Sequence, residues 1–201
     1  MKPVLRGRVG YCGWRQASQA LLLIVLVILV GQIRAAAPDP RQSQVSHWLR
    51  GQVVRVVDGD TVRLRADNQR YYTIRLASID APEAGGRERP GQPRASAARR
   101  GLEDRVLGRR LQARCYDVDN YGRDVCDLLL PEGGTASQSV TRAGLVWANR
   151  QFHGKYLRDP RVAALEAEAR AARRGLWGGD EPVPPWVWRE RCWRQGQCPT
   201  M

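Results

Sequence analysis

Apolar and polar positions alternate along the chain beyond residue 50 with the period of half-buried β-strands. The pattern predicts three strands in close succession, at residues 52–57, 61–66 and 71–79. In the second strand, Val62, Leu64 and Ala66 alternate with polar residues that are mostly cationic. We therefore expect each strand to turn one face toward a core and the other toward solvent.

Three helices are predicted after these strands. Residues 94–107 have a helical composition. Thr135 and Gln138 form a capping box for a second helix that runs to about Val146. Asp159 is placed as the N-cap of a third helix, and the proline that follows suits its first turn.

Two more strands, at residues 111–116 and 123–130, bring the predicted number of strands to five. Five short strands, with helices inserted after the third and appended at the end, are typical of a small closed barrel of the oligonucleotide-binding kind, the OB-fold. The sequence thus predicts a mainly β, α+β domain with a five-stranded OB-fold β-barrel and three helices at residues 51–178. Residues 38–50 form a polar linker before it. The tail, 179–201, is rich in proline and tryptophan, and we expect it to cover the barrel as an extended segment.

The N-terminus has the pattern of a targeting segment. Residues 1–16 are cationic and contain no acid, and residues 20–30 are an unbroken apolar run. This order predicts a secretory signal peptide within residues 1–37. Because Pro38 follows the candidate cleavage position directly, an uncleaved membrane anchor through residues 20–30 is the alternative. Either way, we expect the protein to be exported, in the periplasm or secreted, or anchored in the inner membrane facing the periplasm.

The charge indicates the kind of partner, and the cysteine content agrees with export. The formal net charge is +13, which points to an anionic partner such as nucleic acid. Outside the targeting segment lie four cysteines, an even number. Cys115 and Cys126 flank a turn, and Cys192 and Cys198 bracket a short loop, so two local disulfides are the simplest scheme in an oxidising space. Three pairings of these four cysteines are possible.

Carboxylates stand at two turns beside the predicted strands. Asp58 and Asp60 follow the first strand, and Asp80 and Glu83 follow the third. If the first three strands are antiparallel neighbours, both turns meet at one end of the barrel. Carboxylates together with a backbone carbonyl are the ligands that a hard cation such as Ca²⁺ prefers.

Two arginines would add positive charge to this site: Arg75 on the third strand and Arg123 on the far hairpin. A divalent cation, two arginines and one spare carboxylate suit the attack of water on a phosphodiester, because they offset the charge that develops on the phosphorus oxygens. The spare carboxylate would orient or deprotonate the water. Taken alone, each piece also has a plain structural interpretation, since Asp-Gly is a common turn and Arg75 could be a solvated strand residue.

The motifs as an ordered set resemble the staphylococcal nuclease, or thermonuclease, family over about residues 52–177. The stretches that carry the resemblance are VVDGDTVRL, IRLASIDAPE, DNYGRDV, SVTRAGLVWA and EAEARAARRGLW. The resemblance implies an OB-fold barrel and Ca²⁺-dependent hydrolysis of phosphodiester bonds in DNA and RNA.

The resemblance also assigns roles to individual residues. Arg75, Glu83 and Arg123 match the family's catalytic trio, with Glu83 as general base, or as the group that orders the water, and the arginines on the phosphate. Tyr121 matches a residue that hydrogen-bonds a substrate phosphate. The metal ligands are implied to be the following: Asp60 and Asp80 directly, Asp58 through water, and Ala81 through its main-chain oxygen.

Three positions depart from the staphylococcal enzyme. Asn120 stands where that enzyme has a lysine, and Arg150 and Phe152 stand roughly where two tyrosines flank the bound base. The base-stacking contacts and the substrate preference are therefore open, although Phe152 or Trp147 could offer a stacking face.

Two classes of function follow. The first, which we favour, is a monomeric, exported Ca²⁺-dependent nuclease acting on DNA and RNA. The alternative is a catalytically inactive OB-fold module that only binds nucleic acid. A weaker third idea is an envelope adhesin that relies on basic charge, which predicts strong salt sensitivity and no metal dependence. The complete trio and metal acids favour the enzyme.

Overall fold

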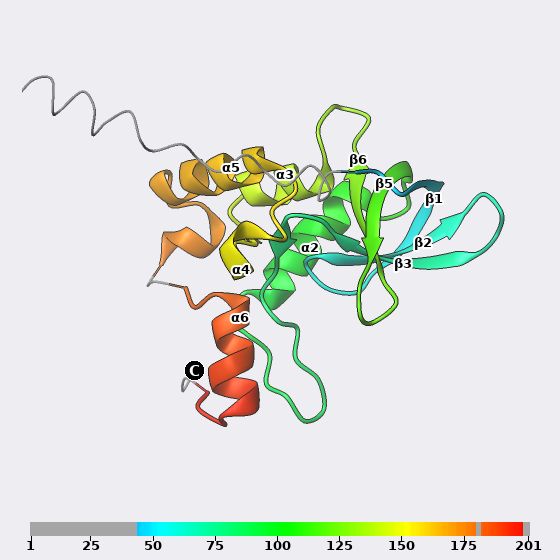
Figure 1. The fold of residues 1–201 in the computed structure, drawn as a ribbon. Coiled ribbons are helices and arrows are strands. Elements are labelled where there is room, and N and C mark those ends of the chain that lie inside the picture. The colour runs from blue at the N-terminus through cyan, green and yellow to red at the C-terminus, as the bar shows by residue number, and fades with distance from the viewer. Residues whose placement is uncertain (1–43, 180–181, 199–201) are drawn as a thin grey trace, which may run out of the picture. The chain divides into compact units, whose positions relative to one another are not determined.

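The computed structural model describes residues 44–179 and 182–198. Five of its strands close into a barrel in the order β1-β2-β3-β6-β5, as Figure 1 shows. Their bounds are β1 His47–Val56, β2 Thr61–Ala66, β3 Tyr71–Leu76, β5 Arg110–Val118 and β6 Asp124–Leu129. The predicted five-stranded OB-fold barrel is confirmed.

The apolar faces predicted from the alternation fill the barrel. Val62 and Leu64 of β2 and Ile74 and Leu76 of β3 are all fully buried. β2 pairs antiparallel with both β1 and β3, as expected, and β3 continues the barrel through a parallel pairing with β6. One face of each strand thus packs in a shared core, which supplies most of the driving force for folding.

The first strand begins earlier than predicted. β1 starts at His47, five residues before the expected start at Gln52, and residues 47–52 pair with β5. The last four residues of the predicted linker, 47–50, therefore belong to the barrel. The sequence pattern did not reveal this part of the strand, because it exists through its backbone hydrogen bonds with a distant partner, β5.

The predicted third strand is divided in two. β3 ends at Leu76, and a short strand, β4 (Ile79–Asp80), follows it. Ser78 separates them with a φ of 70°, a left-handed backbone conformation that breaks a strand. β4 then leaves the barrel and pairs with β7 (Trp147–Ala148), which fixes the position of Asp80.

The three predicted helices are present, and within residues 44–179 two shorter ones accompany them. Their bounds are α2 Ala95–Val106, α3 Ala136–Arg142, α4 Gln151–Gly154, α5 Pro160–Ala171 and the 3₁₀ helix η2 Gly175–Gly178. The capping box of Thr135 and Gln138 and the N-cap of Asp159 are confirmed. Figure 1 shows α3 and α5 packed against each other.

The second helix is shorter than predicted. It ends at Arg142 because Gly144 adopts a φ of 72° and packs directly on the backbone of Arg174. A Cβ at residue 144 would lie 2.3 Å from the Arg174 carbonyl oxygen, so only glycine fits this close approach.

Residues 182–198, called here the C-terminal segment, are helical and not extended as predicted. They form α6 (Pro185–Trp188), which continues into the π-helical turn η3 (Arg189–Arg194). Pro185 at the first position of α6 has the fixed φ that suits a helix start, so the prolines begin this helix and do not prevent it. The expectation of a cover over the barrel is met only in part, because this segment packs on the loop between Glu83 and Gln92.

Both predicted disulfides are present, Cys115–Cys126 between β5 and β6 and Cys192–Cys198 in the C-terminal segment. The N-terminal targeting prediction lies outside the described residues. Within the portion that the structure describes, no helix has both the length and the apolar character to cross a membrane.

The barrel core yields a stability prediction. Leu64→Ala should lower the free energy of unfolding by about 3 kcal/mol, because it removes a fully buried side chain and leaves a cavity. Arg55→Ala, at an exposed position of β1, is the control and should change it by less than about 0.5 kcal/mol. Denaturant unfolding measures both, and a loss below about 1 kcal/mol for Leu64→Ala would contradict this description of the core.

Candidate active site

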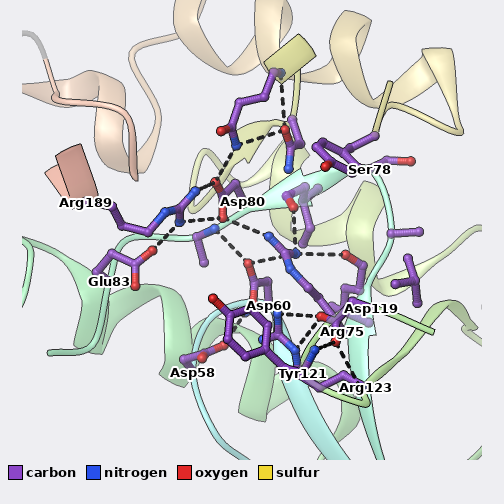
Figure 2. Close-up of a pocket in the computed structure, with 18 of the residues that line it drawn as sticks. Asp58, Asp60, Arg75, Ser78, Asp80, Glu83, Asp119, Tyr121, Arg123 and Arg189 are labelled. Carbon is purple, nitrogen blue, oxygen red and sulfur yellow. Dashed lines mark hydrogen bonds and ion pairs between the residues drawn. The ribbon is translucent and has the colours of Figure 1, made fainter. Parts of the chain in front are cut away.

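A cleft of about 750 Å³ lies beside the barrel, where β3 passes into β4. Every residue that the sequence predicted for the site lines it: Asp58, Asp60, Arg75, Asp80, Ala81, Glu83, Tyr121 and Arg123. Figure 2 labels these residues, except Ala81, and shows their side chains gathered around one cleft. Residues that are far apart in the sequence thus form one site.

A glycine allows the two acidic turns to meet. A Cβ on Gly59 would lie 2.8 Å from the Cβ atoms of Ala81 and Ala98, so the Asp58–Asp60 turn packs against the second turn only because residue 59 has no side chain. The contact is completed by the Ala81 amide, which donates to Oδ2 of Asp60 at 3.1 Å. The conformation of one acidic turn is therefore coupled to that of the other.

Arg75 is the central cation of the site. Its Nη1 lies 3.2 Å from Oδ2 of Asp60, and its Nη2 lies 2.9 Å from Oδ1 of Asp80. Nη1 also donates to the carbonyl oxygen of Ile79 at 3.1 Å. Because the Asp80 side chain is only 2% exposed, these contacts compensate a charge that water cannot reach.

The turn that holds Asp58 and Asp60 places two carboxylates close together, and nearby cations do not fully neutralise them. Burial disfavours the charge of Asp60, but Arg75 and several hydrogen bonds outweigh it and keep the pKa of Asp60 below its usual range. Burial and the neighbouring charge of Asp60 raise the pKa of Asp58 to about 7. An added cation near this pair would therefore be strongly favoured.

Glu83 lies at the edge of the cleft, just after the second turn. Burial raises its pKa, and the guanidinium of Arg189 opposes the rise only in part. A raised pKa brings a carboxylate closer to the range in which it exchanges protons with water at neutral pH. Glu83 is thus one of three carboxylates of this cleft, with Asp58 and Asp80, whose pKa is raised by burial.

Arg123 and Tyr121 come from the hairpin that joins β5 and β6. Asp119 orients this hairpin, because its carboxylate accepts from the backbone amides of Tyr121 and Arg123 and pairs with the Arg123 guanidinium at 2.7 Å. The guanidinium also lies 5.4 Å from the centre of the Tyr121 ring. Since 86% of Tyr121 is exposed, the ring stands in solvent at the rim of the cleft.

The donor groups around Asp60 fit a hard divalent cation in their chemistry. Asp58, Asp60 and Asp80 offer carboxylate oxygens and Ala81 a main-chain carbonyl, which are the ligand types that Ca²⁺ takes. Within residues 44–179 and 182–198, however, no three acidic, histidine or cysteine side chains are arranged as a ready metal cluster. Arginine side chains contact Asp60 and Asp80 in this arrangement.

Sequence reasoning missed several residues of the cleft. Arg189 reaches Asp80 and Glu83 from the C-terminal segment, and Gln151 donates to Oδ2 of Asp80 at 3.4 Å. Asp119, which orients Arg123, had a detectable signal, because it lies four residues before that arginine in a turn. Arg189 had none, since no pattern connects the tail with the barrel.

The departures from the staphylococcal pattern are visible at the rim. Phe152 is 69% exposed and meets Tyr156 edge-on at 5.8 Å, and both line the cleft. Arg150 instead turns away to pair with the buried Glu166. Trp147 is buried against Trp177, so it is not the stacking face that the sequence suggested. Phe152 and Tyr156, together with Tyr121, are exposed aromatic faces at the cleft.

Comparison with known proteins gives a consistent result. The family model described as "Staphylococcal nuclease homologue" matches residues 73–179, more than half of the chain. An "Uncharacterized endonuclease" of Escherichia coli O157:H7 is 36% identical over 143 residues, which cover 71% of this chain and 86% of that protein. A "Micrococcal nuclease" of Shigella flexneri is 36% identical over 148 residues, covering 70% and 80%.

Other relatives match this chain over a smaller part of their own length. A "Probable staphylococcal-like nuclease CAN1" of Oryza sativa subsp. japonica is 34% identical over 118 residues, which cover 59% of this chain and 32% of that protein. The barrel, the ordered motifs and these matches agree. The chain belongs to the staphylococcal nuclease family and is a hydrolase of the nuclease class.

Proposed function

We propose that the protein is a Ca²⁺-dependent nuclease that hydrolyses phosphodiester bonds of DNA and RNA outside the cytoplasm. The observation that carries the proposal is the position of Arg75, which contacts Asp60 and Asp80 at once in a cleft that Glu83 and Arg123 also line. Two acids, a base and two arginines around one cleft are the groups that phosphodiester hydrolysis requires.

In this proposal, Glu83 orients a water molecule and takes its proton as the water oxygen forms a bond to phosphorus and one of the two ester P–O bonds breaks. Arg75 and Arg123 bind the phosphate oxygens on which negative charge develops, and Arg123 also assists the departing oxygen. The low exposure of Asp80 and Arg75 strengthens these interactions, because little water screens them.

Asp60 and Asp80 would hold Ca²⁺ directly, Asp58 through water and Ala81 through its carbonyl oxygen. The bound ion would act as a Lewis acid on a phosphate oxygen. The raised pKa of Asp58 supports this assignment, because burial and the charge of Asp60 leave negative charge that a cation would relieve.

Substrate and location are also part of the proposal. Tyr121, Phe152 and Tyr156 offer exposed aromatic faces for bases at the rim of the cleft, a mode of binding that suits single strands of either sugar type. Two relatives carry "endonuclease" or "nuclease" in their names, which supports cleavage of nucleic acid. Two disulfides support export, with the protein either freed from its signal or anchored through residues 20–30. That the protein is a monomer is a further part of the proposal.

The assignment of Glu83 is tested directly. Glu83→Gln should lower the single-turnover cleavage rate by about 10²–10⁴-fold, because it removes the base. Affinity for single-stranded DNA should stay within a few-fold. Glu88→Gln, the same change at an exposed position of the same loop, is the matched control. Near-normal cleavage by Glu83→Gln would remove Glu83 as the base, and full loss of DNA binding would indicate a structural effect.

The role of Arg123 concerns the chemical step. Arg123→Ala should lower the single-turnover rate by about 10²–10³-fold, because one donor to the developing charge is lost. Arg55→Ala removes the same charge outside the cleft and should leave the rate within about twofold. An unchanged rate in Arg123→Ala would refute the assignment.

Asp60 is proposed as a direct Ca²⁺ ligand. Asp60→Asn should weaken Ca²⁺ binding at least about tenfold, because a neutral amide with one oxygen replaces a negatively charged carboxylate. Calorimetric titration with Ca²⁺ measures this, with Asp104→Asn on the exposed face of α2 as the control. Equal affinity in wild type and Asp60→Asn would show that Asp60 is not a ligand.

A further inference from the structure

The C-terminal segment sends one side chain into the cleft. Arg189, the first residue of η3, pairs with both Asp80 and Glu83, and its own side chain is 31% exposed. Figure 2 shows its guanidinium between these two carboxylates. Glu83, the proposed base, and Asp80, a proposed metal ligand, thus share Arg189 as a partner. Arg189 is not one of the residues that the sequence assigned to the site.

Both carboxylate oxygens of Asp80 are engaged by this contact. Oδ2 accepts from Nη2 of Arg189 at 2.8 Å, and Oδ1 accepts from Nη1 of Arg189 at 3.3 Å and from Arg75 at 2.9 Å. Gln151 adds a donor at 3.4 Å to Oδ2. Because these donors surround Asp80, it cannot also ligate a cation directly unless Arg189 withdraws.

The Glu83 carboxylate is held in the same way, by Nη1 of Arg189. A carboxylate that accepts a charge-assisted hydrogen bond from a guanidinium is a poorer proton acceptor than one facing water. The one contact therefore restrains the base and the metal ligand together.

The segment is held in place by contacts that do not involve Arg189. The Gln92 side chain donates to the carbonyl oxygen of Val183, and the Trp193 indole donates to the carbonyl oxygen of Pro90 at 3.0 Å. Trp188 is 2% exposed, and the Cys192–Cys198 disulfide closes the end of the segment. Arg189 can thus leave the acids while the segment stays docked on the loop that follows Glu83.

We propose that Arg189 is a built-in competitor of the divalent cation: its guanidinium holds Asp80 and Glu83 in an inactive pairing, and cation binding displaces it. The C-terminal segment would then set the Ca²⁺ concentration at which the site becomes competent. This inference rests on the proposed Ca²⁺ dependence. It is a regulation of that site and assigns Arg189 no part in the chemical step.

The test compares Ca²⁺ binding by wild type and Arg189→Gln in calorimetric titrations of the full chain. Arg189→Gln should bind Ca²⁺ at least about tenfold more tightly, because a bidentate, charge-assisted competitor has been removed. The Ca²⁺ concentration that gives half-maximal cleavage should fall in parallel. Arg189→Lys keeps the positive charge but lacks the planar guanidinium, so its Ca²⁺ affinity should lie between those of wild type and Arg189→Gln.

Arg191→Gln is the matched control, because it removes the same charge two residues further along at an exposed position. Its Ca²⁺ affinity should stay within about twofold of wild type. Equal or weaker Ca²⁺ binding in Arg189→Gln would overturn the inference, and so would a gain equally large in Arg191→Gln. Circular dichroism shows whether Arg189→Gln is folded. If it is not, the Ca²⁺ affinity of Arg189→Lys, compared with wild type, decides the test.

Failure of this inference can be told apart from failure of the nuclease proposal. If wild type cleaves DNA with Ca²⁺ and Arg189→Gln binds Ca²⁺ no more tightly, only the competitor is refuted. If Arg189→Gln binds Ca²⁺ more tightly but neither protein cleaves, the competitor is supported and the nuclease proposal fails. If neither protein binds Ca²⁺, both fail.

Discussion

The site depends on the ion bridge in which Arg75 joins Asp60 to Asp80. Each of the two acids belongs to a different turn, and both are almost inaccessible to water. Removal of one partner from a buried pair typically costs about 3–5 kcal/mol, because a charge is left without compensation. Arg75 therefore keeps the two turns together, and the close contact of Gly59 with Ala81 is possible only while they remain so.

The position of Arg75 in this bridge is set by the barrel and by the two turns that it joins. Arg75 stands opposite Thr61 in the β2–β3 ladder, so the barrel register sets its position. The division of the third strand at Ser78 lets β4 fold back and bring Asp80 to the guanidinium. On the opposite wall, Asp119 holds the β5–β6 hairpin so that Arg123 faces the same cleft. Both arginines are thus held in place by the protein itself, which is the preorganisation that their proposed role in transition-state stabilisation would require.

Much of the fold could be predicted from the sequence, because its signals are local. The alternation around Val62 and Leu64, the capping box at Thr135 and the two disulfides each depend on residues close together in the chain. What could not be predicted depends on distant partners. β1 extends back to His47 because β5 pairs with it, and Arg189 reaches Asp80 across 109 positions of sequence. The ordered motifs pointed to residues that line the cleft, but no motif describes the C-terminal segment.

The proposed metal dependence is tested most directly by cleavage of single-stranded DNA by the purified protein with Ca²⁺, with a chelator, and with Ca²⁺ restored after chelation. We predict cleavage with Ca²⁺, its loss with the chelator and its recovery when the ion returns, because in the proposed mechanism the acids around Arg75 hold the cation before a phosphate is attacked. Cleavage that persists in the chelator would contradict the metal assignment. Binding of DNA without cleavage under any condition would show that the barrel serves as a binding module.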